Sequence, residues 1–323
     1  MRFRASVVFL VLTLLGSSLH AAKLRVATLN CEFLVLRKIH MKYGLPFTLR
    51  RERDKRTWGP LAYRRAKLKT ATEAVAKEIA AINAHVIVLT EVGRDDTVKK
   101  LKAAVATAGV NYAHHFTCKS LDTATGQHVA VLSKIPLSNS LAQIPGKKFY
   151  KPEQDDNEEK LTSVVKGMMT TFRFSGKTIH LYGVHLTSER GGGEADARRI
   201  AQASLVRRHY LPKVQKDQHV LVVGDLNDKR LDPALRRIRG FDDIYPDLVQ
   251  TGDKRYFTKK DIGERWTYDF NGVKSQLDHI LASWSLINSA KVRSSVYQPT
   301  GKLMNRYPIT DHRAMIVEFD FRD

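Results

Sequence analysis

Several carboxylate, amide and imidazole side chains stand at the ends of apolar runs in this sequence. They are Asn30 and Glu32, Glu91, His185, Asp225 and Asn227, Asp278 and His279, and Asp311 and His312. Strand ends that meet at one sheet edge place their side chains in one cleft, where ligands commonly bind. Carboxylate and amide oxygens suit hard cations such as Mg²⁺ or Mn²⁺, and histidine transfers protons near neutral pH. The set therefore predicts metal-assisted chemistry.

Each of these residues, taken alone, has a commoner structural explanation. An Asn after a strand is usually a turn residue, an acid such as Glu91 usually lies on the surface, and a histidine such as His185 usually makes a structural hydrogen bond. The segment from Gly224 to Asn227 is also compatible with a tight turn. Because such residues recur at the ends of successive strands, the pattern favours one shared functional site.

Short apolar runs rich in β-branched residues predict the strands that carry these side chains. The predicted strands cover residues 23–30, 86–90, 129–133, 163–174, 178–186, 220–223, 266–270, 277–282, 291–297 and 314–321. Apolar residues at helical spacing predict helices over 64–83, 95–108 and 195–214. Because many strands are adjacent in sequence, we expect an α/β (α+β) fold in which helices flank two packed sheets.

Six motifs together resemble the endonuclease/exonuclease/phosphatase superfamily. They are ATLNCEF (27–33), LTEV (89–92), VHLTSERGG (184–192), GDLND (224–228), QLDHIL (276–281) and TDHRAM (310–315). This superfamily includes DNase I-like nucleases, apurinic endonucleases, sphingomyelinases and inositol polyphosphate phosphatases. The resemblance runs from about residue 24 to residue 321 and implies a DNase I-like, four-layered α/β/β/α sandwich of two mixed sheets. It also implies phosphoester hydrolysis assisted by Mg²⁺, with Mn²⁺ or Ca²⁺ as alternatives.

The resemblance implies a role for each matching residue. The implied metal-site residues are Asn30, Glu32, Glu91 and Asp311, with Glu91 as the principal carboxylate. Asp225 and Asn227 would position the attacking water and the scissile phosphate.

Two histidines complete the implied site. Asp278 would orient His312 and raise its basicity, while His185 would bind a phosphate oxygen or assist the leaving group. The base is either Asp225 or His312, a choice that the sequence leaves open.

The segment after His185 points to one branch of the superfamily. The run HLTSERGGGEADARRIAQ (185–202) is similar to secreted bacterial nucleases, in which a basic, glycine-rich loop leads into an arginine-containing helix. This sequence departs from that pattern at Glu189, where a basic residue often stands. We expect Arg190 to contact phosphate in its place.

The net charge indicates the kind of substrate. The chain contains 54 Lys and Arg against 33 Asp and Glu, a formal charge of +21, and such an excess attracts polyanions. Residues 36–69 are predicted to form a basic loop interrupted by Pro46, Gly59 and Pro60. One hypothesis is that five basic side chains of this loop line a groove for a phosphate backbone: Arg50, Arg51, Arg53, Lys55 and Arg56. The alternative is a solvated loop whose aromatic residues pack locally.

The first residues predict export. Arg2 and Arg4 precede an apolar run over residues 7–15 and a zone of small residues, the pattern of a secretory signal peptide over residues 1–21. Residues 22–323 would then form a single domain, expected to be monomeric and periplasmic or secreted. The two cysteines, Cys31 and Cys118, lie in predicted core strands, and buried thiols are at least as compatible with that position as a disulfide.

Three functions follow, of which the first is favoured. It is an exported endonuclease of low sequence specificity acting on DNA or RNA. The second is a phospholipid phosphodiesterase or small phosphoester phosphatase; no strongly apolar exposed loop is recognisable, which argues mildly against sphingomyelin. The third is a catalytically silent module that binds polyanions, against which the complete set of site residues argues.

Overall fold

The computed structural model describes residues 22–43, 60–152, 159–240, 246–298 and 309–321. Two six-stranded mixed sheets form its centre. Sheet A contains, in spatial order, β15 (Lys291–Val296), β16 (Met315–Phe321), β1 (Ala22–Leu34), β2 (Val86–Val92), β4 (His128–Ser133) and β3 (His114–Thr117). Sheet B contains β11 (Leu248–Gln250), β14 (Asp278–Ser283), β10 (His219–Asp225), β9 (Lys177–His185), β8 (Gly167–Phe174) and β5 (Leu137–Leu141).

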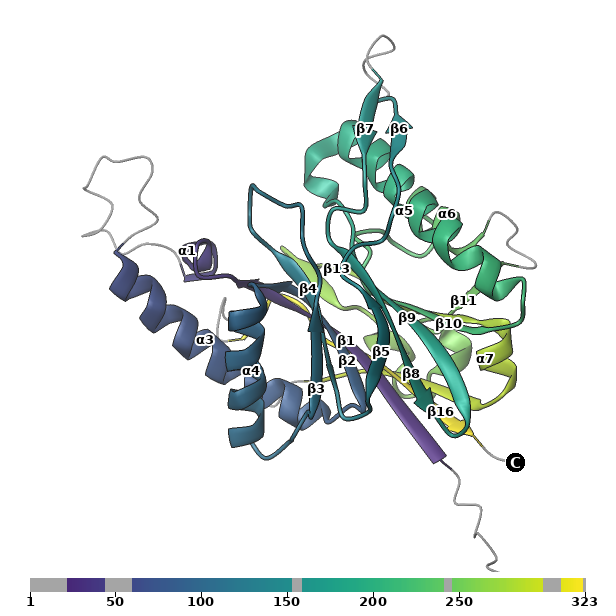
Figure 1. Ribbon diagram of the computed structural model, residues 1–323, viewed down its shortest axis with the longest axis horizontal. Helices are drawn as coiled ribbons and strands as arrows, with labels where there is room; N and C mark the ends of the chain where they lie inside the picture. The colour runs from purple at the N-terminus through teal and green to yellow at the C-terminus, as the bar shows by residue number, and fades with distance from the viewer. Residues whose placement is uncertain (1–21, 44–59, 153–158, 241–245, 299–308, 322–323) are drawn as a thin grey trace, which may run out of the picture.

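Three apolar clusters divide the molecule into four layers. The inner faces of the two sheets share one cluster, in which Val26 and Val88 of sheet A meet Leu181 of sheet B. Helices α3 (Leu61–Ile82) and α4 (Asp95–Thr107) cover the outer face of sheet A. Helices α5 (Gly192–Val214) and α6 (Pro233–Arg239) cover the outer face of sheet B (Figure 1). The predicted α/β/β/α sandwich is confirmed.

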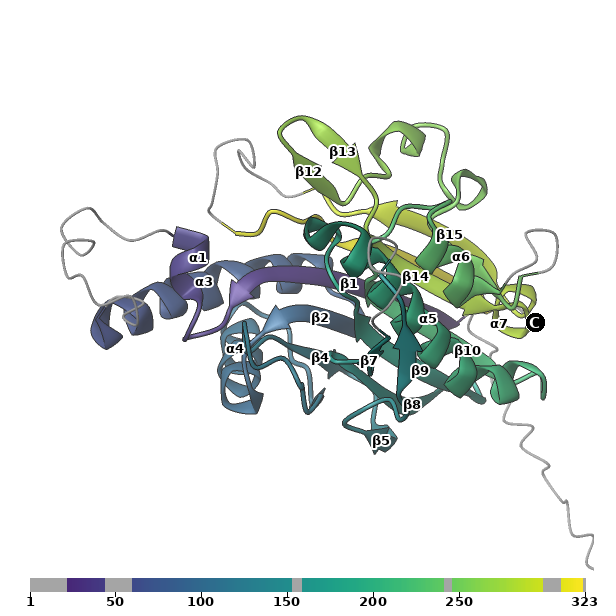
Figure 2. The same cartoon turned by 90° about the horizontal axis from the view of Figure 1, so that it is seen from above.

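Short elements lie outside the sandwich. They are α1 (Ile39–Tyr43), α7 (Trp284–Asn288), the hairpin of β6 (Lys148–Tyr150) with β7 (Lys160–Thr162), and the hairpin of β12 (Tyr268–Phe270) with β13 (Val273–Ser275). Figure 2 shows the β12–β13 hairpin standing away from the two sheets. Three single 3₁₀ turns also occur, at Glu189–Gly191, Lys254–Tyr256 and Ile262–Glu264.

The predicted helices and most predicted strands are present, with three corrections. Residues 36–69 are not one loop, because α1 occupies 39–43 and α3 begins at 61, where Pro60 precedes the first turn without hindering the helix. The strand expected over 163–174 begins only at 167. The strand expected over 266–270 begins at 268, because Thr267 turns its hydroxyl to the backbone of Leu277.

The cysteines are free and buried. Cys31 belongs to the cluster beneath α3 and α4, whereas Cys118 belongs to the cluster between the sheets. The two thiols therefore lie on opposite sides of sheet A, which explains why no disulfide joins them.

The signal peptide predicted over residues 1–21 lies outside the described residues. Within the part of the chain that the structure describes, no helix combines the length and apolar character needed to cross a membrane.

Candidate active site

Sheet B brings three of the predicted residues side by side at one edge. In the strand register, Asp225 at the end of β10 lies opposite His185 of β9 on one side and Asp278 of β14 on the other. Their exposed fractions are 4% for His185, 2% for Asp225 and 0% for Asp278. This row exists because β9 and β10 run parallel and end together. The sequence predicted only that such strand ends share one sheet edge.

Asn30 of β1 connects sheet A to this row. Its Nδ2 donates a hydrogen bond of 2.9 Å to Oδ2 of Asp225. Its Oδ1 accepts a bond of 2.9 Å from the backbone of Glu32. Asn30 also pairs in register with Thr90 of β2, next to Glu91. The site therefore spans the edges of both sheets.

Gly224 makes the close contact between β9 and β10 possible. Its φ is +144°, and a Cβ at this position would stand 1.9 Å from the carbonyl oxygen of Val184. No side chain fits there without separating the strands. The glycine of the GDLND motif is thus required by packing, and it sets the position of the Asp225 carboxylate that follows it.

Several site residues adopt left-handed backbone conformations. The φ angles are 44° at Glu32, 50° at Phe33, 56° at Glu91 and 49° at Asn227. Such a conformation costs a non-glycine residue about 1–2 kcal/mol and persists when surrounding contacts enforce it. Two contacts here are bonds of 2.9 Å from the Phe33 amide to Glu91 Oε2 and of 2.8 Å from the Asn227 amide to Asp225 Oδ1.

His312 and Asp278 form the predicted pair. Nδ1 of His312 lies 2.7 Å from Oδ2 of Asp278, and Thr310 Oγ1 accepts the His312 backbone amide at 3.1 Å. Burial alone would lower the pKa of His312, but the adjacent Asp278 carboxylate prevails and holds that pKa well above 6.5. Asp225, Asp278 and His312 each place one ligand atom within 4.8 Å of the others.

The remaining carboxylates lie on the sheet A side. Glu91 is partly buried, and burial raises its pKa, with the Asp311 carboxylate adding to that rise. Glu32 is buried against Lys42 of α1, whose Nζ donates to Glu32 Oε2 at 2.8 Å and to the backbone oxygen of Ile309. The Asp311 side chain is 39% exposed, and its Oδ1 lies 4.0 Å from His312 Nε2.

A lysine also enters the site, immediately before β8. Nζ of Lys166 donates to Gln127 Oε1 at 3.0 Å and lies 3.4 Å from Nε2 of His185. That Nε2 is 3.8 Å from Asp225 Oδ2 and 4.0 Å from Glu91 Oε1, beyond hydrogen-bond reach. Burial first, and then the Lys166 and His312 charges, lower the pKa of His185 well below 6.5.

The β12–β13 hairpin covers His312. The Tyr268 ring lies 4.7 Å from the His312 ring, and the two residues also form a backbone bridge. Phe270, two residues on, is nearly parallel to Tyr268, with an interplanar angle of 13°. Arg190 donates to the Tyr268 hydroxyl at 3.1 Å and lies 5.7 Å from the Phe270 ring centroid. The bond to Tyr268, and then the Asp311 and Glu91 charges, raise the pKa of Arg190.

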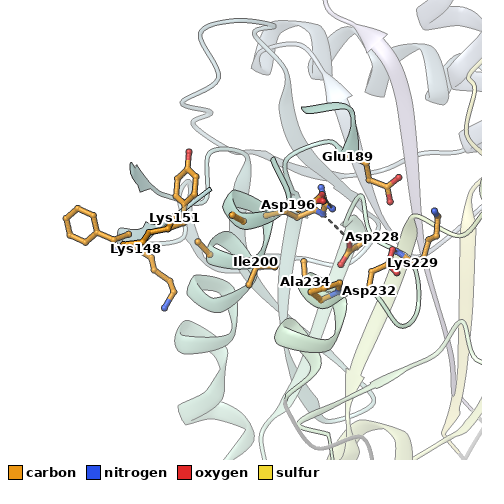
Figure 3. Close-up of a pocket in the computed structure, with 15 residues that line it drawn as sticks. Lys148, Lys151, Glu189, Asp196, Ile200, Asp228, Lys229, Asp232 and Ala234 are labelled. Carbon is orange, nitrogen blue, oxygen red and sulfur yellow. Dashed lines mark hydrogen bonds and ion pairs between the residues drawn. The ribbon is translucent and has the colours of Figure 1, made fainter. Parts of the chain in front are cut away.

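A cavity of about 690 Å³ lies beside the GDLND segment (Figure 3). Asp228 and Asp232 line it together with Glu189, opposite the basic side chains of the β6–β7 hairpin. Asp228 accepts bonds from the buried Arg199 at 3.1 Å and from the Leu235 amide at 2.8 Å. These two bonds fix the loop after β10.

The structure thus brings together the described residues that the sequence singled out. Around the edge lie His185, Asp225, Asn227, Asp278, His312, Asn30, Glu32, Glu91, Asp311 and Arg190. The roles assigned to them remain predictions. The five basic residues at 50, 51, 53, 55 and 56 lie outside the described residues.

Four participants were missed: Lys42, Gln127, Lys166 and Tyr268. Lys166 had a signal, because it is a lone charge within an otherwise uncharged run over residues 161–172.

The buried group of Asp225, Asp278 and His312 at the paired ends of the two sheets could hold a metal ion or transfer protons. The sequence profile of the Endonuclease/Exonuclease/phosphatase family matches residues 27–312, and the chain belongs to this family. It is accordingly a metal-dependent hydrolase of phosphoester bonds. No curated protein matches the chain by sequence.

Solved structures share the fold at low sequence identity. Sphingomyelinase C from Streptomyces griseocarneus is 21% identical with a TM-score of 0.54, covering 92% of this chain and 99% of that one. Beta toxin from Staphylococcus aureus is 17% identical with a TM-score of 0.56, covering 91% and 99%. Truncated TDP2 from Caenorhabditis elegans is 15% identical with a TM-score of 0.54, covering 93% and 98%. A variant of the beta toxin contains bound magnesium ions.

Proposed function

We propose that this phosphoesterase is an exported endonuclease that cleaves DNA or RNA with little sequence preference. The observation that carries the proposal is the aromatic surface formed by Tyr268 and Phe270, contacted by Arg190 and adjacent to His312. In a nucleic acid, a planar base lies close to every phosphodiester linkage, so aromatic side chains beside the catalytic residues can stack on a base. Base stacking on such side chains is sequence-tolerant, because every base has a π-face, and is worth about 1–3 kcal/mol per base.

The charge of the chain supports the same substrate. With signal residues 1–21 removed, the two arginines lost from +21 leave +19. A field of this size concentrates any polyanion near the site, and each phosphate contact makes binding more sensitive to salt. The predicted leader supports a periplasmic or secreted enzyme, and the charge and the Tyr268–Phe270 aromatic surface support a nucleic-acid substrate.

The donor set fits a divalent metal. Glu91 uses one carboxylate oxygen for the Phe33 amide and keeps Oε1, while Asn30 Oδ1 accepts a single bond. Oxygen donors with free lone pairs, together with the Asp311 carboxylate whose charge acts on Glu91, suit Mg²⁺ or Mn²⁺. Glu91, Asp311 and Asn30 would hold such an ion, and Glu32 would add a further carboxylate to the metal site. When bound, the ion would neutralise charge on the phosphoryl oxygens.

The side chains supply the remaining chemistry. Asp225 is held by Asn30 on one oxygen and by the Asn227 amide on the other, so its orientation is fixed. Asp278 holds His312 through Nδ1, which leaves Nε2 facing the site. Burial raises the pKa of Asp225 to about 7, a value suited to accepting a proton from water. His312, whose pKa Asp278 holds well above 6.5, accepts a proton at Nε2 only once it is deprotonated. Arg190 would bind a neighbouring phosphate of the substrate.

A phospholipid phosphodiesterase is the second candidate. The β12–β13 hairpin exposes 53% of Phe270 and 65% of Val273. The sequence shows no strongly apolar exposed loop, and these two side chains stand among the polar residues Asp269, Asn271 and Lys274. Two exposed apolar side chains at a hairpin tip are compatible with contact to a lipid surface.

The first test is hydrolysis of supercoiled plasmid by residues 22–323 with Mg²⁺ or Mn²⁺, and with EDTA. His312→Ala serves as the inactive control, and sphingomyelin vesicles are assayed in parallel. We expect nicking that requires the metal and is lost in the variant. Intact plasmid together with lipid hydrolysis would replace the nuclease by the second candidate.

Substitution of Phe270 separates the two candidates further. Leucine keeps the apolar contact needed at a lipid surface but cannot stack on a base. Phe270→Leu should therefore raise the KM for nucleic acid about as much as Phe270→Ala, by roughly 5- to 150-fold for one stacking contact. The matched control is Phe149→Leu on the β6–β7 hairpin, where the phenylalanine is 58% exposed. Equal KM values for wild type and both Phe270 variants would contradict the stacking role.

A further inference from the structure

The β12–β13 hairpin, which stands away from the two sheets (Figure 2), is fixed at both of its ends. The turn Asn271–Gly272 has φ angles of 52° and 85°, the positive pair that a two-residue type I′ hairpin turn requires. At the base, the Thr267 amide donates to the Ser275 carbonyl at 2.8 Å, and the Thr267 carbonyl accepts the Arg313 amide at 2.7 Å. Since Arg313 directly follows His312, the hairpin is tied to the segment that carries this histidine.

Three rings extend from the site along this hairpin. The centroid of the Tyr268 ring lies 4.7 Å from that of His312, and the centroid of the Phe270 ring lies 6.4 Å from that of Tyr268. His312 is 7% exposed, whereas Phe270 is 53% exposed. A base next to a phosphate at His312 would therefore meet the Tyr268 and Phe270 rings.

Only an unpaired base can stack on these rings. In a duplex, each base is paired and stacked between its neighbours, and proteins reach its edges through the grooves rather than its faces. Such a base must be unstacked and unpaired before it can lie on an aromatic side chain. In a single strand the bases are already free to stack on protein aromatic groups.

The charges around the rings suit the phosphates of the same strand. Arg190 donates to the Tyr268 hydroxyl at 3.1 Å and lies 5.7 Å from the Phe270 ring centroid. Lys274 is exposed on β13. The one acid of the hairpin is Asp269, whose Oδ1 accepts a backbone amide of the turn at 2.8 Å. Basic side chains and aromatic rings therefore lie together on one element.

We propose that the aromatic surface of Tyr268 and Phe270 selects unpaired nucleic acid, so that the enzyme cleaves single strands and locally unpaired segments in preference to duplex. This inference rests on the proposed nuclease function and adds to it the strand form of the substrate. Because the hairpin is fixed before the substrate arrives, little conformational freedom is lost when a base stacks on it. For a paired base, unpairing offsets most of the gain from stacking.

The alternative is that Phe270 enters a duplex as a wedge between two base pairs, as apolar side chains of minor-groove proteins do. The two roles differ in their effect on the duplex. A wedge would make Phe270 necessary for duplex cleavage. A stacking surface for unpaired bases would leave duplex cleavage independent of Phe270.

The test compares one oligonucleotide of mixed sequence, as DNA and as RNA, either single-stranded or annealed to its complement. With the full mature chain and Mg²⁺ or Mn²⁺, kcat/KM should be about 10- to 100-fold higher on the single strand, the factor expected for one unpairing step. Phe270→Ala should lower the single-strand value by roughly 5- to 150-fold and leave the duplex value unchanged. The matched control is Phe149→Ala on the β6–β7 hairpin, where the phenylalanine is 58% exposed, and it should keep the wild-type preference.

Two further measurements support this comparison. Fluorescence anisotropy of the labelled strands in EDTA measures binding without cleavage, and the single strand should bind more tightly. Negative supercoiling favours local unpairing, so a supercoiled plasmid should be cut faster than the same plasmid after linearisation. Thermal melting identifies a variant that fails to fold, and Phe270→Trp, which keeps an aromatic face, should retain the single-strand preference.

The outcomes separate this inference from the nuclease function. Equal cleavage of single strand and duplex by wild type, or an equal loss on both in Phe270→Ala, would overturn the inference and leave the nuclease function in place. Cleavage of neither form, by a preparation that hydrolyses sphingomyelin vesicles, would overturn both.

Discussion

The Asp278–His312 pair allows a quantitative prediction through Asp278→Asn. The bond between Oδ2 and Nδ1 is 2.7 Å long, and Asp278 is fully buried. The backbone amide of Asp278 bonds to Thr267 Oγ1 at 3.1 Å, a contact that the substitution leaves in place. The variant should therefore fold, with the imidazole still near its position but without the partner charge.

The expected loss follows from that single bond. A buried hydrogen bond to a charged group contributes about 1.5–3 kcal/mol, which corresponds to roughly 10- to 150-fold in kcat if the bond acts in the transition state. Removing the carboxylate also removes the charge that raises the pKa of His312. Loss of a negative neighbour disfavours the imidazolium, so the pKa falls. Whichever limb of the pH profile His312 controls should move to lower pH.

Steady-state kinetics across pH with saturating Mg²⁺ measures both effects. Asp96→Asn, an exposed acid in the first turn of α4, is the control for loss of one negative charge. A folded Asp278→Asn enzyme whose kcat stays within about threefold of wild type, with an unshifted profile, would refute the orienting role.

Three further predictions concern other parts of the site. Gly224→Ala should destabilise the fold by about 3 kcal/mol or more in urea denaturation, because its Cβ meets the Val184 carbonyl. Burial lowers the pKa of His279 from 6.5 to about 4, so the unfolded chain binds this proton first as the pH falls. Between about pH 7 and about pH 4.5, wild type should then lose about 2.5 kcal/mol relative to His279→Gln. Glu91→Gln should raise the Mg²⁺ concentration for half-maximal activity by about 10-fold or more.

A control variant or a contradicting outcome can be stated for each of these three predictions. Gly193→Ala in α5, where nothing lies within 4 Å of the added Cβ, should be neutral or stabilising. A constant stability gap between wild type and His279→Gln over the acid range would contradict burial of the neutral imidazole. For Glu91→Gln, Mn²⁺ binding measured by calorimetry should weaken together with activity. Unchanged binding would remove Glu91 from the metal site.

The sequence predicted the layers and the site edge because the signal was local. Apolar runs define β1, β2, β9 and β10. β9 and β10 end in His185 and Asp225, and β1 and β2 carry Asn30 and Glu91 near their ends. Parallel pairing of β1 with β2 and of β9 with β10 then makes these residues neighbours. The strands that were missed, such as β3 (HHFT) and β5 (LSNSL), carry few apolar residues. They join the sheets at their edges, where pairing depends on tertiary context more than on propensity.

The site residues that the sequence analysis missed also depend on tertiary context. A lysine such as Lys166 or Lys42 is expected at the surface, and only the three-dimensional arrangement shows its ammonium beside a histidine or a buried glutamate. Tyr268 resembles an ordinary strand residue until its hairpin is seen to fold over His312. Lys166 and His185 are 19 positions apart in the sequence. A contact between such distant residues produces no periodic pattern from which it could be predicted.

The left-handed backbone at Glu32, Phe33 and Glu91 has a consequence for protein engineering. At such φ angles glycine is free of the steric penalty that these residues bear, and asparagine tolerates the conformation better than glutamate does. A selection for heat resistance alone would therefore enrich glycine or asparagine at positions 32 and 91. The resulting enzymes would be hardier and inactive, so a thermostable library of this protein should hold those codons constant.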